Sequence, residues 1–412
     1  MRRVVSSDSD EYDVDQYSAV CGRTLDNSTF SYSIYNITLR NSQGSGVYGI
    51  ILCLILFVHY SGGIMNILID GMGGDYAPQE IVKGAISAAR KIEDTITIIG
   101  AQELISTELE KRGWDGDNIA VVNATEAVTN NEAPAMAVRK KKDATVNVGM
   151  RMIKAGDGDV FISGGSTGAL LAAGLLGLGR IKGIKRPAIA AFFPQIGKNE
   201  TTLLLDCGAN VDCKSEYLYQ FGIMGSIYVE NVKGIEHPDV RLLNVGTEAE
   251  KGDDLHKEAH ELLTNSSINF KGNVEGREIA SGVCDVVVTD GFSGNVFLKS
   301  SEGLALSIMG RLKDVLLGGT ISRIAALMLS KQLKEMKKEF DYSEEGGAPI
   351  LGLKGPVLKI HGSSKAYAVY NAILKARDYV ASDVTGQIEK ALTDNDELSE
   401  YKTEVTDGNA EA

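Results

Sequence analysis

Cysteine and histidine are scarce in this chain of 412 residues, which contains five of each. The cysteines show no CxxC spacing, so the sequence argues against a zinc site or a disulfide framework and favours the reducing cytoplasm. The histidines are scattered, and we expect neither a metal centre nor a cofactor. Basic residues are also too few for a general nucleic-acid binder, which must neutralise phosphates. The 42 Lys and Arg residues face 55 Asp and Glu residues, a formal net charge of −13.

Residues 1–64 differ in composition from the rest of the chain. They are rich in Ser, Asp, Asn and Tyr and end in an apolar run over residues 47–60. The run is shorter than the roughly 20 residues of a membrane span, and it lies far from the N-terminus for a signal peptide. An upstream extension, with the folded protein starting at Met65, is the interpretation we favour. A weak membrane anchor and a signal peptide are the alternatives.

From Met65 onward, short apolar runs alternate with helical patterns. The predicted helices cover residues 78–91, 133–152 and 169–179, among others. The predicted strands cover residues 66–70, 95–100, 120–123, 159–163, 188–193, 202–206, 240–244, 286–289 and 357–360. This alternation predicts a largely parallel sheet covered by helices on both faces, a three-layer α/β/α sandwich. We expect one catalytic α/β domain over residues 65–393, followed by an acidic tail over 394–412.

Residues 301–340 form a segment of a different kind, without proline and with one strong turn signal at Gly318 and Gly319. Its second half has apolar residues at spacings of three and four, and lysines are interspersed among them. This pattern predicts a projecting amphipathic helical arm with a basic end. Such an arm can pack on the sheet, form a dimer seam or touch a membrane surface.

Clusters of glycine and polar residues follow several predicted strands. They occupy residues 206–210, 244–248, 272–277 and 289–295. Ligands of open α/β sheets bind at the carboxyl edge of the strands, where glycine allows backbone amides to approach an anion. Four clusters within a hundred residues indicate an enzyme that handles a phosphate-like group.

The turn at residues 163–169 is the best candidate for an anion site. It follows a strand and opens a helix, so its free amides and the hydroxyls of Ser166 and Thr167 can hold phosphate. Its spacing matches neither the Walker A motif nor GxGxxG, so it does not indicate ATP or a dinucleotide. A tight strand-to-helix turn without a ligand is the alternative.

Several other polar residues are candidates. Asp70 and Asp75 can bind a metal, orient a basic group or cap the next helix. Asp290 ends a strand, and the amides of Asn295, Asn210 and Asn273 can donate hydrogen bonds to a carbonyl or phosphate oxygen. These last four residues all lie in the glycine-rich clusters.

Lys251 is the most promising cation near these clusters, because a positive charge there can stabilise phosphate or an oxyanion. A solvated loop lysine is the alternative.

Cys207 follows a strand but has no histidine nearby in sequence, and small buried cysteines are far commoner than nucleophilic ones. His361 is equally well explained as a site residue or a structural one. The basic run over residues 139–142 is either a solvated face or a docking patch for an acidic partner.

Together these segments resemble the bacterial phosphate acyltransferase family over residues 65 to about 383. The segments that resemble it are 69–78 (IDGMGGDYAP), 165–170 (GSTGAL), 179–187 (GRIKGIKRP), 206–212 (DCGANVD), 244–248 (NVGTE), 272–277 (GNVEGR), 285–299 (DVVVTDGFSGNVFLK), 346–349 (GGAP) and 361–364 (HGSS). Three positions depart from the usual family pattern, namely Gly71, Ser166 and Cys207. Residues 1–64 have no counterpart in the family.

The resemblance implies an acyl-transfer reaction in phospholipid biosynthesis, in which acyl-[acyl carrier protein] and inorganic phosphate give acyl phosphate. It also implies a homodimer in the cytoplasm, peripherally associated with the membrane, where a membrane acyl-phosphate:glycerol-3-phosphate acyltransferase uses the product. Phosphate itself can be the nucleophile. The implied catalytic residues are Lys251 and Asn295. The implied substrate-binding residues are Asp70, Gly165, Ser166, Thr167, Gly168, Asn210, Thr247, Asn273, Asp290 and His361.

Three other functions remain open at this stage. A phosphotransacetylase-like enzyme that uses acyl-CoA would have the same fold and phosphate turn. A nicotinamide-linked dehydrogenase of the related fold is a second alternative, and a membrane-bound scaffold without catalytic activity is a third.

An acyl carrier protein is strongly acidic, so an enzyme that binds it would need a basic surface patch. Residues 139–142 and 331–338 of this chain are the candidates for that patch.

Overall fold

The computed structural model describes residues 20–27, 30–36, 63–129, 131–198, 200–339 and 345–392. The chain divides into two compact units, residues 1–63 and residues 64–412. Strands β1 (Val20–Asn27) and β2 (Phe30–Asn36) of the first unit pair as an antiparallel hairpin. The apolar run at 47–60 and the acidic tail at 394–412, both noted in the sequence, lie outside the described residues.

The second unit contains an eleven-stranded sheet with the strand order β10-β9-β11-β8-β7-β12-β13-β6-β3-β4-β5. The strands are β3 (Asn66–Asp70), β4 (Thr95–Gly100), β5 (Ile119–Asn123), β6 (Val160–Ser163), β7 (Ala188–Gln195), β8 (Glu200–Leu205), β9 (Val240–Asn244), β10 (Phe270–Glu275), β11 (Val286–Val288), β12 (Ala348–Leu351) and β13 (Val357–Lys359). Four strands from β10 to β8 are parallel to one another, and so are the five from β13 to β5. The antiparallel pairings of β7 and β12 join these two blocks.

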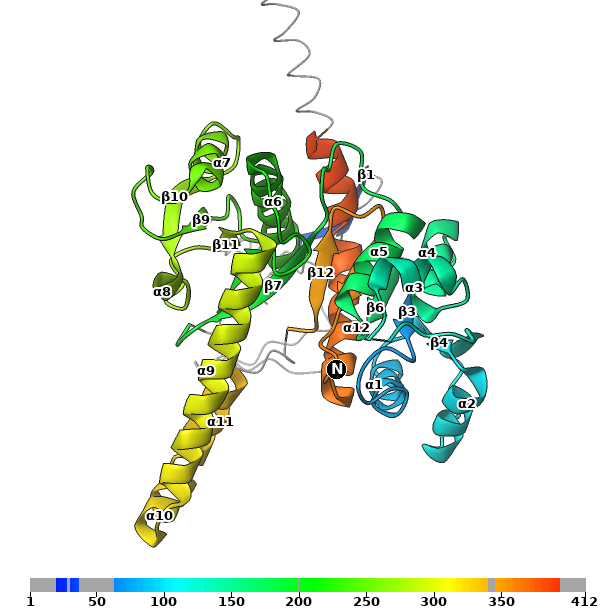
Figure 1. The fold of residues 1–412 in the computed structure, drawn as a ribbon. Coiled ribbons are helices and arrows are strands. Elements are labelled where there is room, and N and C mark those ends of the chain that lie inside the picture. The colour runs from blue at the N-terminus through cyan, green and yellow to red at the C-terminus, as the bar shows by residue number, and fades with distance from the viewer. Residues whose placement is uncertain are drawn as a thin grey trace, which may run out of the picture. The chain divides into compact units, whose positions relative to one another are not determined.

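Helices cover both faces of the sheet (Figure 1). They are α1 (Gln79–Ala89), α2 (Gln102–Lys111), α3 (Pro134–Lys140), α4 (Thr145–Ala155), α5 (Thr167–Gly177), α6 (Ser215–Tyr228), α7 (Asp254–Thr264), α8 (Gly276–Ile279), α9 (Gly291–Leu317), α10 (Thr320–Met328), α11 (Ser330–Glu339) and α12 (Ala366–Ala381). A π-helical turn, η2 (Val229–Lys233), continues α6.

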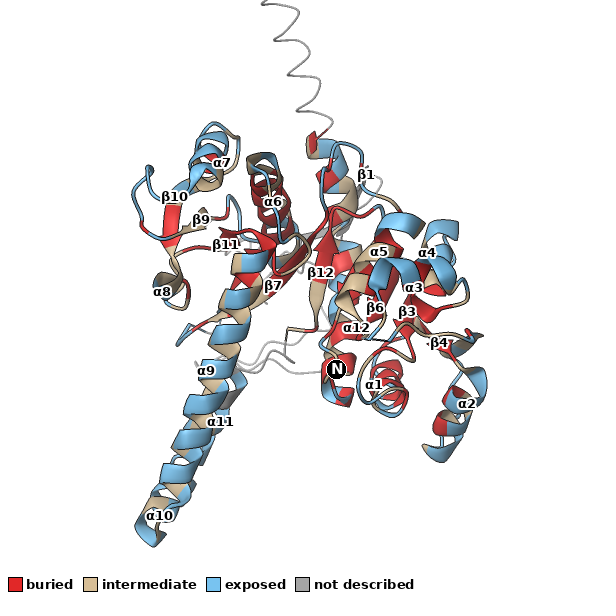
Figure 2. Ribbon diagram, viewed as in Figure 1, coloured by how far each residue is buried: buried red, intermediate tan, exposed pale blue. Residues whose placement is uncertain are grey.

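Side chains that alternate along each strand enter two separate hydrophobic cores, because successive residues of a strand point to opposite faces. Ile67 and Ile69 of β3 belong to the core under α1, α6, α7 and α12, whereas Leu68 belongs to the core under α4 and α5. Central strands such as β3, β6 and β11 are buried along almost their whole length and are mostly red in Figure 2, because both faces of the sheet are covered there. This explains why the strands were apolar runs without alternation in the sequence.

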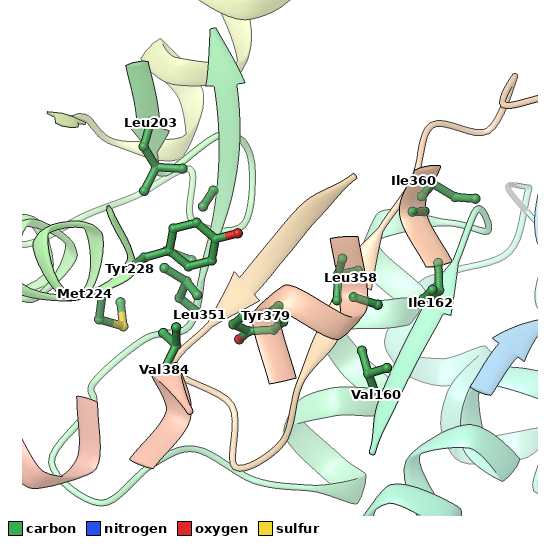
Figure 3. Close-up of a cluster of buried hydrophobic side chains, with 14 of the residues drawn as sticks. Val160, Ile162, Leu203, Met224, Tyr228, Leu351, Leu358, Ile360, Tyr379 and Val384 are labelled. Atoms are coloured by element: carbon green, nitrogen blue, oxygen red, sulfur yellow. The ribbon is translucent and has the colours of Figure 1, made fainter. Parts of the chain in front are cut away.

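The first core is continuous across the junction of the two strand blocks. Figure 3 shows Tyr228, Leu351 and Tyr379 around β12, with Leu358 of β13 farther along. The rings of Tyr228 and Tyr379 have centroids 5.8 Å apart. One shared core therefore holds the two blocks together.

The predicted α/β fold, with a mostly parallel sheet between two helical layers, is confirmed. The prediction of one helix over residues 133–152 is wrong, because the chain forms α3 and α4 with a break between them. At this break the carboxylate of Asp143 accepts hydrogen bonds from the backbone amide and the hydroxyl of Thr125, at 2.8 and 2.6 Å. A long-range contact therefore outweighs the local helical preference.

The strand predictions missed β10 and β12. Residues 272–275, predicted as a turn cluster at a strand end, lie inside β10, and only Gly276 and Arg277 leave the strand to start α8. Glycine and asparagine have low strand propensity, so pairing with β9 decides the conformation here.

The predicted helical arm over 301–340 is present in the described residues as far as Glu339, but it begins earlier. Helix α9 starts at Gly291, and the arm turns at Gly318 and Gly319, as the sequence indicated, and again near Leu329. In Figure 1 the arm leaves the sheet, and in Figure 2 most of it is exposed. Among the residues that the structure describes, no helix combines the length and hydropathy that a membrane crossing requires.

Candidate active site

The turn between β6 and α5 lines a polar cavity of about 390 Å³. Gly164, Gly165, Ser166 and Thr167 all contribute to its wall, and α5 begins at Thr167. The first amides of a helix have no partner within the helix, and they add partial positive charge to this end. The wall of the cavity can therefore bind an anion.

Asp70 lies behind this turn, at the end of β3. Its carboxylate is buried, and its Oδ2 accepts a 2.7 Å hydrogen bond from the Oγ of Ser163. The same Oγ accepts a 3.1 Å hydrogen bond from the backbone amide of Gly165. Burial raises the pKa of Asp70, and its hydrogen bonds act in the opposite direction. Asp70 thus holds the turn in place from behind the cavity.

Gly73 shows how tightly this corner is packed. A Cβ on Gly73 would lie 2.4 Å from Oδ2 of Asp70 and 2.8 Å from the amide nitrogen of Gly165. No larger residue fits there without displacing the turn. This close approach gives a physical reason for the glycine-rich stretch that follows β3.

The start of α9 forms another part of the wall. Asp290 caps the helix, because its Oδ1 accepts hydrogen bonds from the amides of Phe292 and Ser293 at 3.0 and 2.9 Å. Asn295 lies in the next turn and lines the cavity. Its Nδ2 would be 3.1 Å from a Cβ on Gly208, whose φ of +121° also favours glycine. The side chain of Asn295 thus rests against the turn after β8.

Asp206 organises that turn after β8. Its buried carboxylate accepts hydrogen bonds from the backbone amides of Ile189, Ala209 and Asn210, at 2.9, 3.1 and 2.7 Å. The side-chain amide of Asn210 donates to Asp206 Oδ2 and to the carbonyl oxygen of Pro187. The Asn210 side chain therefore stabilises the turn and does not line the cavity.

The end of β13 adds two basic side chains to the cavity wall, those of Lys359 and His361. Burial lowers the pKa of Lys359 to about 8, although the carboxylates of Asp70 and Asp75 favour its charged form. Burial also lowers the pKa of His361, followed by the charge of Lys299. The Nδ1 of His361 lies 2.7 Å from the Oγ of Ser363.

Lys251 and Thr247 lie on the loop after β9, where both are exposed and neither lines the cavity. Asn244 Nδ2 donates to the carbonyl oxygen of Lys251 at 3.0 Å. Asn273, buried in β10, donates to the carbonyl oxygen of Glu248 at 2.7 Å. These residues form a second polar cluster, which Asn273 supports from the neighbouring strand.

The structure thus brings together five of the predicted residues in the cavity wall: Gly165, Ser166, Thr167, Asn295 and His361. Asp70 and Asp290 support the wall from behind. Gly168 is in α5, where a Cβ would lie 2.8 Å from Pro134, so this glycine permits close packing of α3 on α5.

Sequence reasoning missed Lys359 and Lys299, which also line the cavity. Lys359 lies in the predicted strand over residues 357–360, two residues before His361, and its place near the end of that strand was the available signal. Cys207 also lies in the wall, but its Sγ is 3.6 Å from the carbonyl oxygen of Leu204 and burial raises its pKa. A thiol kept protonated in this way is a poor nucleophile.

Comparison with known proteins identifies the family. The model of the family described as "Fatty acid synthesis protein" matches residues 65–387. The chain belongs to this family. A phosphate acyltransferase of Thermoanaerobacterium thermosaccharolyticum is 47% identical over 328 residues, which cover 80% of this chain and 97% of the relative. A phosphate acyltransferase of Oceanobacillus iheyensis is 49% identical over 325 residues, covering 79% of this chain and 96% of the relative.

As a member of the fatty acid synthesis protein family with relatives of these names, the chain is an acyl-transferring enzyme, as predicted. Among solved structures, a phosphotransacetylase from Streptococcus pyogenes matches with a TM-score of 0.53 and 19% identity. The match covers 77% of this chain and 95% of the phosphotransacetylase. At this identity the likeness concerns the fold alone.

Proposed function

We propose that the enzyme transfers the acyl group of acyl-[acyl carrier protein] to inorganic phosphate, giving acyl phosphate and the free thiol of the carrier. The main support is the polar cavity, which the N-terminal turn of α5 lines together with Lys359 and Asn295. Free amides and a lysine are groups that bind phosphate. The names of the relatives support the same acceptor.

In the proposed reaction, phosphate lies against Gly165, Ser166 and Thr167. One oxygen of hydrogen phosphate attacks the thioester carbonyl carbon and the new C–O bond forms. The C–S bond breaks, and the leaving thiolate takes up the proton that the phosphate loses. The Nδ2 of Asn295 donates a hydrogen bond to the oxyanion that develops on the carbonyl oxygen. Because phosphate is the nucleophile, the thiol of Cys207 takes no part.

The remaining predicted residues have supporting roles in this proposal. Asp70, Asp290 and Asn210 hold the three turns around the cavity. Lys251 is proposed as a second catalytic cation, on the loop that Thr247 and Asn273 help to form. Because Lys251 does not line the cavity, its positive charge would act on the substrate from outside the cavity wall.

The proposed donor is acidic, and the surface offers two groups of basic side chains to it. Arg139, Lys140 and Lys142 are exposed around the end of α3, and Lys331 and Lys334 are exposed on α11. Opposite charges on the two proteins would accelerate their encounter at low ionic strength. Charge reversal at Arg139 and Lys142 should raise the KM for the carrier-bound donor and leave the KM for phosphate unchanged.

We also propose that the arm, formed by α9–α11, contributes to a homodimer and to peripheral attachment at the cytoplasmic membrane surface. Large apolar side chains are exposed on α10, among them Ile321, Leu327 and Met328 at 84%, 74% and 79%. Attachment would bring the product to a membrane acyl-phosphate:glycerol-3-phosphate acyltransferase in phospholipid synthesis. Co-sedimentation with anionic vesicles, comparing the wild type with Ile321→Ser/Met328→Ser, tests this part.

Mass spectrometry of the products from acyl-[acyl carrier protein] and phosphate tests the proposed reaction. Acyl phosphate and free carrier thiol should form together, and neither should form without phosphate. A parallel reaction with acyl-CoA distinguishes the alternative, a phosphotransacetylase-like enzyme. Turnover with acyl-CoA but none with the carrier protein would refute the proposed donor.

A further inference from the structure

The connection between α5 and β7 carries a group of exposed basic side chains, and we call its residues 180–186 the basic loop. The basic side chains are those of Arg180, Lys182, Lys185 and Arg186. Ile181 and Ile184 lie between them in sequence and are buried in the first core. The loop therefore packs its apolar side chains inward and presents its charges to solvent.

Hydrogen bonds to neighbouring elements hold the basic loop in one shape. Gln220 of α6 is buried, and its Oε1 accepts a 2.8 Å hydrogen bond from the backbone amide of Lys185. Its Nε2 donates a 2.9 Å hydrogen bond to the carbonyl oxygen of Gly183. The amide of Ile181 donates to the carbonyl oxygen of Gly352 at 3.0 Å. An ordered loop costs less conformational entropy when a partner binds to it.

The charges of the basic loop are not neutralised by the rest of the fold. The Cζ of Arg186 lies 5.7 Å from the centre of the Tyr217 ring, and Nη1 of Arg180 donates to the carbonyl oxygen of Lys185. These contacts orient the two guanidinium groups but add no negative charge. Within the described part of the chain, none of the four basic side chains forms an ion pair. The loop is therefore suited to an acidic partner.

The fold brings an acidic segment of the same chain to the edge of this loop. Residues 384–392 form a helix after α12. Three side chains of this helix are buried in the first core, those of Val384, Ile388 and Leu392. A Cβ on Gly183 would lie 3.6 Å from the Cβ of Leu392. The acidic tail, residues 394–412, begins two residues later and contains seven Asp and Glu residues and one lysine, a formal net charge of −6.

We propose that the basic loop is the docking surface of the chain's own acidic tail. Asp394, Asp396 and Glu397 follow Leu392 by two, four and five residues. An extended chain advances at most about 3.6 Å per residue, so these three carboxylates lie within about 18 Å of Leu392. They can therefore reach the cations on either side of Gly183. This surface lies outside the polar cavity, and the inference does not depend on the proposed function.

Tethering explains why weak ion pairs suffice for this contact. An exposed ion pair changes an equilibrium by only roughly 1.4- to 5-fold, so a free peptide of the same sequence would bind weakly. A short tether raises the effective concentration of the tail to about the millimolar range. The contact should be lost in high salt, because the Debye length falls to about 3 Å at 1 M. An acidic partner that used the basic loop would have to displace the tail first.

Carbodiimide cross-linking of the full chain tests the contact, because this reagent forms an amide between a lysine amine and a carboxylate that touch. In about 20 mM salt, Lys182 and Lys185 should form amides with tail carboxylates, and in about 1 M salt the yield should fall at least about fivefold. Mixing ¹⁵N-labelled and unlabelled copies separates links within one chain from links between copies. Lys140 and Lys142 of the other basic run are the matched control and should give few links to the tail.

The rate of trypsin cleavage in the tail provides a second measurement. Lys402 is the one basic residue of the tail, so cleavage after it reports how accessible the tail is. In low salt, Lys182→Ala/Lys185→Ala should accelerate this cleavage at least about threefold, since two ion pairs are lost. In high salt the wild type should be cleaved at the same rate as this variant. Arg139→Ala/Lys140→Ala is the control and should keep the wild-type rate.

A change in the tail itself completes the experiment. Asp394→Asn/Asp396→Asn/Glu397→Gln leaves the basic loop intact and should be cleaved as fast as the loop variant. Equal rates in the wild type and both variants would overturn the inference. Cross-links found only between labelled and unlabelled copies would assign the loop to the tail of a second copy instead. Equal cross-linking to the basic run at residues 139–142 would show that the attraction is non-specific, and it would overturn the inference as well.

Discussion

The Oγ of Ser163 donates a 2.7 Å hydrogen bond to Oδ2 of Asp70 and accepts a 3.1 Å hydrogen bond from the amide of Gly165. The first two residues end neighbouring parallel strands, β6 and β3. This short relay joins two loops that are far apart in sequence, and it sets the direction of the amides at the start of α5. The geometry of the proposed phosphate site thus depends on a carboxylate that lies behind it.

Asp70→Ala should therefore raise the KM for phosphate by about tenfold or more, since hydrogen bonds to charged groups contribute roughly 1.5–3 kcal/mol. The KM for the acyl donor should change little. Initial rates at varied phosphate concentration measure the effect, and Asp115→Asn, at an exposed position, is the control. An unchanged phosphate KM would show that the turn keeps its shape without Asp70.

Lys359 should give phosphate binding a pH dependence in the alkaline range. Its pKa is lowered from 10.5 to about 8, so its positive charge is present below about pH 8 and is lost as the pH rises through that value. The KM for phosphate should consequently increase above about pH 8. Lys359→Arg should remove this increase, because a guanidinium stays protonated throughout.

The neutral variant Lys359→Met completes this test. It should have a high phosphate KM at all pH values and no increase above about pH 8. If the wild type and Lys359→Met show the same pH profile, another group is responsible for it.

Lys251→Ala tests the catalytic cation proposed on the loop after β9. Loss of one charge-stabilising group should lower kcat by at least about tenfold, with the circular dichroism spectrum unchanged. Lys257→Ala, on the adjoining α7, is a suitable control because Lys257 is also exposed. Turnover close to that of the wild type would remove Lys251 from the mechanism.

Two glycines in helices should respond oppositely to alanine. A Cβ on Gly84 would lie 2.5 Å from Cβ of Val369 and 2.7 Å from the carbonyl oxygen of Ala366. Gly84→Ala should lower the free energy of unfolding by about 1–3 kcal/mol because α1 and α12 must separate. Gly303→Ala, with open space around it, should instead stabilise α9 by up to about 1 kcal/mol. Urea unfolding measures both changes, and destabilisation by Gly303→Ala would contradict the open surroundings of that glycine.

A variant that starts at Met65 should retain full activity, because the family match begins at residue 65. The kcat and KM values of this truncated enzyme would be compared with those of the full chain. An inactive or insoluble product would show that residues 1–64 are needed. The proposal that they are an upstream extension would then be wrong.

Local patterns were enough to predict most elements of the fold. The apolar runs at β3, β4, β6 and β8 were unambiguous because these strands are buried on both faces over most of their length, and Gly318 with Gly319 marked the turn of the arm. The failures at Asp143 and at Asn273 have a common cause. In both places a partner distant in sequence decides the backbone conformation, and no short window of sequence contains that partner.

The amino-acid sequence by itself determined the alternation of strands and helices, the glycine turn at Ser166 and the family, since all of these are properties of consecutive residues. Only the tertiary structure decided which turns meet. It placed Ser166, Asn295 and Lys359 around one cavity and left Lys251 on a neighbouring loop, because strand order and the antiparallel junction through β7 and β12 set the distances between segments. The tertiary structure likewise placed Leu392 against Gly183, which brings the start of the acidic tail to the basic loop.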